Sequence, residues 1–286
     1  MSSTATKNVA AKTGAGQRKQ IALLGCGKMG GILLQAFLHR KLVSAGEVVA
    51  TVQHEEKSRS LSSDLAKVPL GTDNRLAVAG ARVVLLCVKP QALPQVLDEI
   101  VSNVAPGALV ISIAASTTTQ FIQQRLGKDV AVVRAMPNTP AMVGAAMTAL
   151  CAGPAANGEH LETAKRLFES IGRVVVVDEK HMDAITALSA SGPAFAFVIL
   201  ESLAEAGVKV GLPREMATTL AAQTLFGSAK LALETGHHPA LLKDAVTTPA
   251  GCTIEGLMEL ERGGLRVTLM NAVVKTAQRA KELMGS

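Results

Sequence analysis

The feature that most constrains the fold is a glycine-rich turn between an apolar run and a helical segment. The run Ile21–Leu24 has the character of a buried strand, and Gly25-Cys26-Gly27-Lys28-Met29-Gly30 follows it directly. A G-x-G-x-x-G sequence in the order strand, turn, helix is the fingerprint of dinucleotide binding. The first glycine permits a sharp turn, the second lets the backbone approach a pyrophosphate, and the third allows close helix–strand packing. We expect dinucleotide phosphates on the free N–H groups of this helix start. The alternative is a glycine loop that only ends a strand.

Residues 19–177 have the alternating pattern of an α/β domain. Short β-branched runs alternate with segments of helical period, as in a parallel sheet covered by helices on both faces. The expected strands are Ile21–Leu24, Val48–Val52, Arg82–Val88, Leu109–Ile113, Val130–Ala135, Met147–Cys151 and Arg173–Val177. The expected helices include Lys28–Leu38, Lys57–Leu65, Ala92–Val101, Thr118–Leu126 and Leu161–Ile171. The prediction is a doubly wound parallel sheet of the Rossmann type.

Residues 178–286 are expected to form a second, all-helical domain. After Asp178 no β-rich run appears, and long stretches are rich in Ala, Leu, Met, Lys and Glu at helical spacing. The clearest stretches are Phe195–Glu205, Arg214–Glu234 and Leu265–Leu283. So small and apolar a helical half is expected to bury further surface against a second subunit. The alternative is a self-contained bundle.

The composition excludes several classes of protein. Of 286 residues, 48% are hydrophobic, which supplies a sizeable core, and no uninterrupted apolar run reaches the ~18 residues of a membrane span. Four of the six net positive charges come from Lys7, Lys12, Arg18 and Lys19, and the chain has no Trp or Tyr. A basic surface or an aromatic platform for nucleic acid is therefore not indicated. We expect a soluble, cytoplasmic protein that binds neither nucleic acid nor a membrane.

The cysteines and the N-terminal segment also favour a cytoplasmic protein. Cys26, Cys87, Cys151 and Cys252 are scattered without a C-x-x-C pair, and the six histidines show no ligand spacing. The sequence thus predicts neither disulfides nor a metal site, which is typical of a reducing compartment. Residues 1–18 carry one arginine and no apolar face, so we expect a disordered tail rather than a transit peptide.

Five motifs together are similar to those of one enzyme family. Besides the glycine turn, they are Cys87-Val88-Lys89-Pro90, Arg134-Ala135-Met136-Pro137-Asn138-Thr139-Pro140, Ser189-Ala190-Ser191-Gly192-Pro193-Ala194 and Lys243-Asp244-Ala245-Val246-Thr247-Thr248-Pro249-Ala250-Gly251-Cys252-Thr253. In this order and spacing, from about Gln20 to the C-terminus, they resemble pyrroline-5-carboxylate reductase. The combination is very specific, whereas the glycine turn alone is not.

The resemblance implies an NAD(P)H-dependent oxidoreductase that reduces the C=N bond of 1-pyrroline-5-carboxylate to give L-proline, the last step of proline biosynthesis. It also implies a Rossmann domain followed by a helical dimerisation domain, and homodimers that assemble into decamers. The chain departs from the family pattern at Lys28, Ala190, Ala250 and Cys252. Ala190 and Ala250 stand where glycine is usual, which strains the backbone if φ is positive there.

Cofactor preference depends on the end of the second strand. Gln53 and His54 lie there, and the acid that marks NAD preference is missing. Glu55 and Glu56 follow and would repel a 2′-phosphate, but Lys57, Ser58 and Arg59 come next and could hold one. We therefore expect NADPH as cofactor, with NADH possible. The alternative is that the two basic residues only solvate a helix start.

Further cofactor contacts are expected at the ends of the later strands. By resemblance, Cys87–Pro90 lies against the cofactor's ribose and phosphate, with a solvated loop lysine as the alternative for Lys89. Ala114-Ala115 leaves room on the nicotinamide side, and by resemblance Asn74 lies beside the adenosine ribose or its phosphate. Asn138, in a loop restricted by two prolines, could orient the nicotinamide or the substrate, and a purely structural turn is the alternative.

The candidate substrate residues lie in the last motif. It precedes the helical run Ile254–Leu260, so the N–H groups of Gly251, Cys252 and Thr253 are expected to form an anion site suited to a carboxylate. Thr248 or Thr253 could instead only cap the helix. Resemblance and position nominate Thr253 as the catalytic residue nearest the imine nitrogen, with Thr248, Gly251 and Cys252 as substrate-binding neighbours. A protonated C=N is already electrophilic, so catalysis is expected to be mostly orientation of two ligands.

Two other functions compete with this interpretation. A 3-hydroxyacid dehydrogenase of similar architecture needs a catalytic lysine a few residues after the Ser191-Gly192 turn, but the chain is apolar through Leu200 and its next lysine is Lys209. A cofactor sensor or scaffold would keep the glycine turn but has no reason to keep the anion site. Turnover of NADPH with pyrroline carboxylate distinguishes the enzyme from the sensor.

Overall fold

The structure is a computed structural model that describes residues 20–54 and 65–284. The described residues form two compact units. The first contains the residues up to Ala190 together with those from Ala280 onward, and the second is Ser191–Arg279. The expected tail of residues 1–18 and most of the expected helix Lys57–Leu65 lie outside the described residues.

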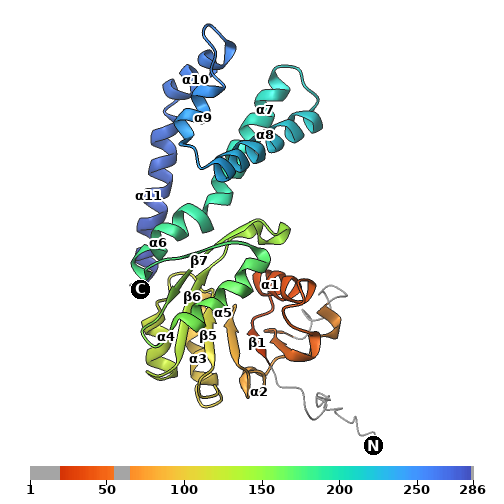
Figure 1. Cartoon of the computed structure of the whole chain (residues 1–286), viewed down its shortest axis with the longest axis vertical. Coiled ribbons are helices and arrows are strands. Elements are labelled where there is room, and N and C mark those ends of the chain that lie inside the picture. Colours follow the sequence, from red (N-terminus) through yellow and green to blue (C-terminus); the bar gives the residue numbers. More distant parts are fainter. Residues whose placement is uncertain (1–19, 55–64, 285–286) are drawn as a thin grey trace, which may run out of the picture. The chain divides into compact units, whose positions relative to one another are not determined.

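The first unit is built on one sheet (Figure 1). Among the described residues its strand order is β3-β2-β1-β4-β5-β6-β7-β8. The strands are β1 Ile21–Leu24, β2 Val48–Thr51, β3 Leu70–Gly71, β4 Val83–Leu86, β5 Leu109–Ser112, β6 Ala131–Met136, β7 Ala146–Ala152 and β8 Gly172–Val176. The doubly wound sheet and seven predicted strands are confirmed.

Two features of the sheet differ from the prediction. The edge strand β3 has only two residues and was not predicted. Strand β7 pairs antiparallel with β6, whereas the other neighbouring strands are parallel. The connection from Met136 to Ala146 contains only the 3₁₀ helix Thr139–Val143. A parallel pairing of β7 with β6 would need a crossover connection of a dozen or more residues, so this short loop permits only antiparallel pairing.

Two layers of helices cover the two faces of the sheet. One face packs against α1 (Lys28–His39) and α5 (Gly158–Phe168). The other packs against α2 (Asn74–Val78), α3 (Leu93–Ile100) and α4 (Thr119–Leu126). Successive strand residues point to opposite faces, so strands buried on both sides must be apolar throughout, as β1 and β4 are. The predicted helices in this unit that fall on described residues are confirmed, with ends shifted by no more than three residues.

Short helical turns connect these elements. The 3₁₀ helices are Ala45–Glu47, Leu65–Lys67, Pro90–Ala92, Thr139–Val143, Glu169–Ile171 and Glu179–His181. The helix α6 (Met182–Ile185) continues into a π-helical turn, Thr186–Ala190.

The segment Glu179–Ala190 is helical but packs on the α/β unit. Met182 is fully buried in a small apolar cluster with residues of β6 and β7. Arg134, 1% exposed, extends from β6 toward this segment, with Nη1 3.6 Å from Oε1 of Glu179 and Nη2 3.8 Å from Oδ1 of Asp183. Glu179 also accepts from the N–H and the hydroxyl of Thr119, at 2.8 and 2.7 Å. The β structure thus ends at about the predicted boundary after residue 177, but the compact units divide later, after Ala190.

The second unit is helical throughout, as predicted. Its helices are α7 (Gly192–Lys209), α8 (Arg214–Thr235), α9 (Pro239–Ala245), α10 (Cys252–Arg262) and most of α11 (Leu265–Met284). Helices α7 and α8 approach closely at Gly207, where an added Cβ would lie 2.8 Å from Cβ of Ala217. A salt bridge of 2.5 Å between Arg214 and Glu205 joins the same two helices.

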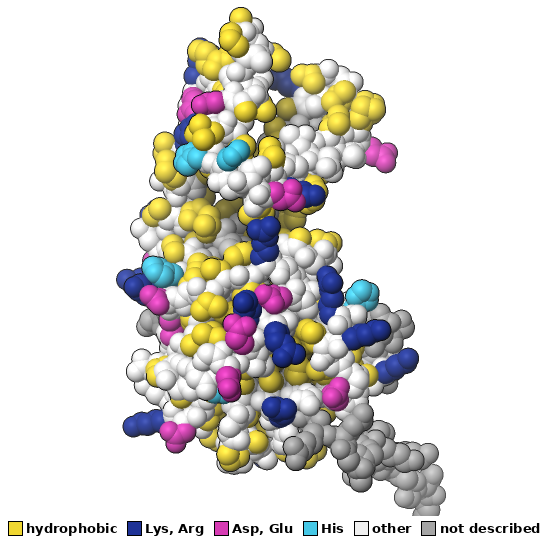
Figure 2. All heavy atoms as spheres, viewed as in Figure 1, with side chains coloured by type: hydrophobic (Ala, Val, Ile, Leu, Met, Phe, Trp, Pro, Cys, Tyr) yellow, Lys and Arg dark blue, Asp and Glu magenta, His cyan; other side chains and the backbone are white. Residues whose placement is uncertain are grey.

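The helical unit buries few side chains of its own. The buried residues of α7 and α8 are alanines, Ala204, Ala217 and Ala221. Large apolar residues are exposed along the helices, and Figure 2 shows apolar side chains gathered over them, while charges of both signs are interspersed over the α/β unit. The exposed residues include Phe197, Val198, Met216, Leu220, Phe226, Leu233, Leu241, Met258, Val267 and Met270. This exposed apolar surface favours burial against a partner over a self-contained bundle.

One stretch passes the length and composition test for a membrane span. Within the described residues, Glu179–Lys209 contains an 18-residue window with a mean hydropathy of 1.5. Only 6% of that window is buried inside the structure. This stretch is interrupted by charged and polar residues, so it was not found in the sequence as an uninterrupted apolar run. The observation is one of length and composition, and a protein partner can cover such a surface as well as lipid can.

Candidate functional site

The glycine turn has the geometry that a dinucleotide requires. Gly25 has φ of +92°, and an added Cβ would lie 2.9 Å from the carbonyl oxygen of Cys87. At Gly30 an added Cβ would lie 2.4 Å from the carbonyl oxygen of Gly25. At Gly27 nothing lies within 4 Å of an added Cβ, so the space above the turn is open. These are the three glycine roles that the fingerprint implies: a sharp turn, an open approach and close packing.

The turn also occupies the right place in the sheet. Strand β1 lies between β2 and β4, so the chain crosses to one side after β1 and to the other side before β4. The turn after β1 is thus at the switch point where open α/β sheets bind ligands. Gly27 is the N-cap residue of α1 and offers no side-chain cap, and the first turn of α1 has no acidic residue. The first N–H groups of the helix are therefore available to an anion.

Strand β2 holds the turn through one residue that sequence reasoning missed. The carbonyl oxygen of Thr51 accepts from the N–H of Gly25 at 3.1 Å and from that of Cys26 at 2.6 Å. Thr51 is buried at the end of β2. Its signal in the sequence was a single hydroxyl residue within the otherwise apolar run Val48–Val52.

The cysteines of this region carry no charge near pH 7. Burial raises the pKa of the Cys26 thiol to about 11. The pKa of the Cys87 thiol is also raised, chiefly by burial and further by the neighbouring Cys26. Because both thiols stay protonated, they bring no negative charge to a site expected to receive phosphates.

Most of the cofactor residues predicted from strand ends lie along one edge of the sheet. Strands β1, β2, β4, β5 and β6 are mutually parallel, so their carboxyl ends meet at that edge. The residues that follow these ends are the glycine turn, with Lys28 exposed and Met29 partly buried, Gln53, His54, Cys87, Val88, Lys89, Pro90, Ala114, Ala115 and Asn138. Gln53, His54 and Lys89 are exposed, whereas Ala114 is buried. Lys57, Ser58 and Arg59 lie outside the described residues.

Asn74 reaches the same edge from the start of α2. Its Oδ1 accepts a hydrogen bond of 2.7 Å from the Thr51 hydroxyl, and its Nδ2 donates one of 2.8 Å to Glu99 of α3. The side chain is therefore held in place beside the end of β2, where a Rossmann domain contacts the adenosine ribose. Sequence reasoning missed Glu99, which lies in the last turn of the amphipathic helix α3 and belongs to no motif.

Asn138 has partners at both ends of its amide. Its Oδ1 accepts from the N–H of Met147 at 3.0 Å, and its Nδ2 donates to the carbonyl oxygen of Ser189 at 3.1 Å. These bonds tie the proline-rich loop to β7 and to the π-helical turn. They favour the structural interpretation of the side chain, and a contact with the nicotinamide or the substrate stays a prediction.

The last motif forms a tight turn before α10. The carbonyl oxygen of Thr248 accepts from the N–H of Gly251 at 3.0 Å, and Ala250 has φ of +56°. Pro249 in the second position and a positive φ in the third are the features of a type II β-turn. The strain considered for Ala250 is thus present, whereas Ala190 is not among the described residues with positive φ.

Helix α10 begins at this turn without a side-chain cap. Gly251 is its N-cap residue, and neither Thr248 nor Thr253 supplies a capping hydrogen bond. The capping-only alternative is therefore wrong. The N–H of Gly251 is also not free, because it donates to Thr248, so the expected anion site narrows to the N–H groups of Cys252 and Thr253. Thr253 is partly buried, and Thr248 and Cys252 are exposed.

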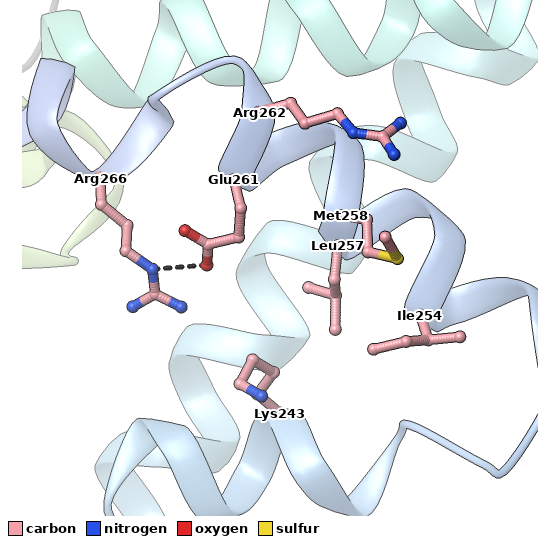
Figure 3. A pocket seen from close by; sticks show the side chains of 7 residues that line it. All are labelled: Lys243, Ile254, Leu257, Met258, Glu261, Arg262 and Arg266. Carbon is pink, nitrogen blue, oxygen red and sulfur yellow. Dashed lines mark hydrogen bonds and ion pairs between the residues drawn. The ribbon is translucent and has the colours of Figure 1, made fainter.

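A hollow of about 350 Å³ lies on the helical unit next to this motif (Figure 3). Its apolar part comes from α10, and its polar part includes a hydrogen bond of 2.6 Å between Arg266 and Glu261. The lining residues are Lys243, Ile254, Leu257, Met258, Glu261, Arg262 and Arg266. The predicted substrate residues do not line this hollow, so it does not replace them as the candidate site.

Comparisons with known proteins agree with both parts of this chain. Residues 179–283 match the family model "Pyrroline-5-carboxylate reductase dimerisation", and residues 20–116 match "NADP oxidoreductase coenzyme F420-dependent". The pyrroline-5-carboxylate reductase of Methanosarcina acetivorans is 41% identical over 93% of this chain and 98% of its own length. That of Arabidopsis thaliana is 37% identical over 93% of this chain and 96% of its own length.

Solved structures give the same result. The pyrroline-5-carboxylate reductase of Coxiella burnetii has a TM-score of 0.86 and 34% identity, covering 93% of this chain and 99% of its own. The pyrroline carboxylate reductase of Plasmodium falciparum, solved with NADP bound, has a TM-score of 0.83 and 27% identity, covering 94% of this chain and 100% of its own. Fold, motifs and similarity over nearly the whole length agree, and this chain belongs to the pyrroline-5-carboxylate reductase family.

Proposed function

We propose that this chain reduces 1-pyrroline-5-carboxylate to L-proline with a nicotinamide dinucleotide, the last step of proline biosynthesis. The observation that carries the proposal is the presence, in one chain, of two helix starts suited to anions. One follows the glycine turn and suits a pyrophosphate, and the other is the start of α10, which suits a carboxylate and begins beside Thr253. The substrate has one carboxylate and one imine, so both of its polar groups find a partner in this motif.

The reaction needs orientation more than acid or base chemistry. When bound, the reduced nicotinamide supplies a hydride to the imine carbon, and the protonated nitrogen keeps its proton as the C=N bond becomes a C–N bond. The N–H groups of Cys252 and Thr253 hold the carboxylate, with Thr248 beside them. The Thr253 hydroxyl hydrogen-bonds to the ring nitrogen and, together with the carboxylate contacts, fixes the orientation of the ring.

The cofactor is held by the glycine turn and by the strand ends around it. The open space above Gly27 and the uncapped start of α1 suit the pyrophosphate. NADPH is the preferred form in this proposal, because the end of β2 carries Gln53 and His54 instead of an acid. Lys57 and Arg59, outside the described residues, are proposed to hold the 2′-phosphate.

Assembly follows from the apolar helical unit. The exposed apolar residues of α7, α8, α10 and α11 support a homodimer formed through this unit, and the resemblance extends the proposal to a decamer assembled from such dimers. Light scattering at micromolar concentration tests it: a dimer or larger particle is expected, and a monomer would contradict it. Such a partner would cover the apolar stretch of α7, so we propose a cytoplasmic protein that binds neither a membrane nor nucleic acid.

The competing dehydrogenase finds no support in α7. This helix starts at Gly192, and its first lysine, Lys209, is its last residue. The catalytic lysine required a few residues after the Ser191-Gly192 turn is absent from the sequence.

Steady-state kinetics test the proposed function. We expect NADPH oxidation that depends on 1-pyrroline-5-carboxylate and yields one proline for each NADPH consumed. A protein that binds NADPH but does not turn over would be the sensor instead. Kinetics with both cofactors also test the preference, since NADPH should give the higher kcat/KM.

A further inference from the structure

A chain of hydrogen bonds links the glycine turn to helix α3. The N–H of Gly25 lies 3.4 Å from Oγ1 of Thr51, and this hydroxyl donates to Oδ1 of Asn74 over 2.7 Å. Nδ2 of Asn74 in turn donates to Oε2 of Glu99 over 2.8 Å. Thr51 is buried, and Asn74 and Glu99 are partly buried. The network thus lies where β1 and β2 end, beside the turn proposed to hold the dinucleotide.

Glu99 fixes the direction of the bonds in this network. An ionised carboxylate only accepts hydrogen bonds, so the amide of Asn74 must turn its nitrogen toward Glu99 and its oxygen toward Thr51. The Thr51 hydroxyl must then donate to Asn74 and keeps a lone pair for the N–H of Gly25. A hydroxyl can both donate and accept, so Thr51 alone would allow the amide either orientation. The acid on α3 therefore decides which end of the amide faces which way.

The orientation of the amide matters for the cofactor. Nδ2 of Asn74 carries a second N–H, for which the described part of the chain provides no partner. This side chain lies at the end of β2, where Rossmann domains contact the adenosine ribose. A 2′-phosphate has acceptor oxygens, whereas a ribose 2′-hydroxyl both donates and accepts. An amide that presents N–H therefore favours the phosphate, and one that presents C=O does not.

We propose that Glu99 is a positioning residue that sets the cofactor preference by holding Asn74 with its N–H, rather than its C=O, toward the adenosine 2′ position. This inference rests on the proposed NADPH-dependent function. Simple charge repulsion predicts the opposite effect, because removing an acid near a phosphate would strengthen its binding. The two explanations therefore predict opposite changes in NADPH affinity when Glu99 is replaced.

The test is the equilibrium binding of NADPH and of NADH, followed by cofactor fluorescence without substrate. Glu99→Leu removes the acceptor, and we expect it to weaken NADPH binding about tenfold, or about 1.4 kcal/mol, and to change NADH binding less than about twofold. Glu99→Gln keeps the shape and one acceptor oxygen but no longer forces the amide orientation. It should weaken NADPH binding by about threefold, again without effect on NADH.

The control is Asp98→Leu. Asp98 is the neighbouring acid on α3, and it pairs with Arg125 at 2.8 Å instead of with the network. This variant loses the same charge from the same helix and should leave both dissociation constants unchanged.

Three outcomes would overturn the proposal. Tighter NADPH binding by either Glu99 variant would show that charge repulsion dominates. Equal weakening of both cofactors would show that Glu99 only supports the fold. Unchanged binding of both cofactors to a folded Glu99→Gln would show that it does not position Asn74. A parent protein that binds neither dinucleotide would instead refute the proposed function, so the two failures are distinguishable.

Discussion

Replacing Ala250 by glycine should stabilise this protein, although alanine-to-glycine changes usually destabilise. Ala250 has φ of +56° in the turn before α10. A left-handed conformation costs an L-residue about 1–2 kcal/mol, and glycine is free of this cost. Glycine also gains freedom in the unfolded chain, which lowers stability by about 0.4–1 kcal/mol. Taking the midpoint of each range, the net expectation for Ala250→Gly is a gain of about 0.8 kcal/mol, or about 2–3 °C in Tm for a chain of this size.

A second alanine provides the control. Ala229 is exposed inside α8, where the backbone is helical, and Ala229→Gly should lower the free energy of unfolding by about 1 kcal/mol. Urea unfolding of both variants and the parent, under one condition, shows whether each substitution raises or lowers the free energy of unfolding. The hydrogen bond from Gly251 to Thr248 does not involve the side chain of Ala250, so kcat/KM of Ala250→Gly should stay within about twofold. Destabilisation of similar size in both variants would refute the reasoning, because it would mean that Ala250 is not strained.

Three further substitutions test the two halves of the site. In Gly30→Ala the new Cβ would lie 2.4 Å from the carbonyl oxygen of Gly25, so we expect a loss of about 1–3 kcal/mol of stability and weaker NADPH binding by titration; parent-like binding would contradict the close approach. Thr253→Val should lower kcat by about 10²–10³ while the free energy of unfolding changes little, because Thr253 makes no capping bond; an undiminished kcat would end its catalytic assignment. Arg59→Ala should reduce the ratio of kcat/KM for NADPH over NADH, and a parent that prefers NADH would already oppose this expectation.

The elements that sequence predicted best are those whose side chains repeat with a regular period. The apolar strand β1 and the helix α1 on either side of the glycine turn were placed to within one residue. Strand β3 escaped prediction because two residues, Leu70 and Gly71, cannot show a period. The antiparallel direction of β7 could not be predicted from the side-chain pattern either, because it follows from the short connection between Met136 and Ala146.

The candidate site was predictable only where a residue type has one physical use. Gly25 and Gly30 are positions where a Cβ would meet backbone atoms, so their roles follow from the residue type alone. Asn138 is different, because an amide can contact a ligand or tie a loop, and only the positions of Met147 and Ser189 show that its polar atoms are engaged. Glu99 gave no signal, because its partner Asn74 comes from another helix that folding brings near.

The two proposed anion sites both lie at helix starts whose N-cap residue is a glycine, in contrast to the helices with a capping side chain. Helices α2, α4 and α5 begin with Asp73, Thr118 and Asn157, whose side chains accept from their own helix's first turn. Helices α1 and α10 begin instead with Gly27 and Gly251, which have no side chain to do so. A capped helix start has used part of its donor capacity, whereas a glycine start leaves the N–H groups and the positive end of the helix dipole to a ligand. Helices α3, α7 and α8 also begin without a side-chain cap, so a missing cap is compatible with the proposed pyrophosphate and carboxylate sites and does not by itself identify them.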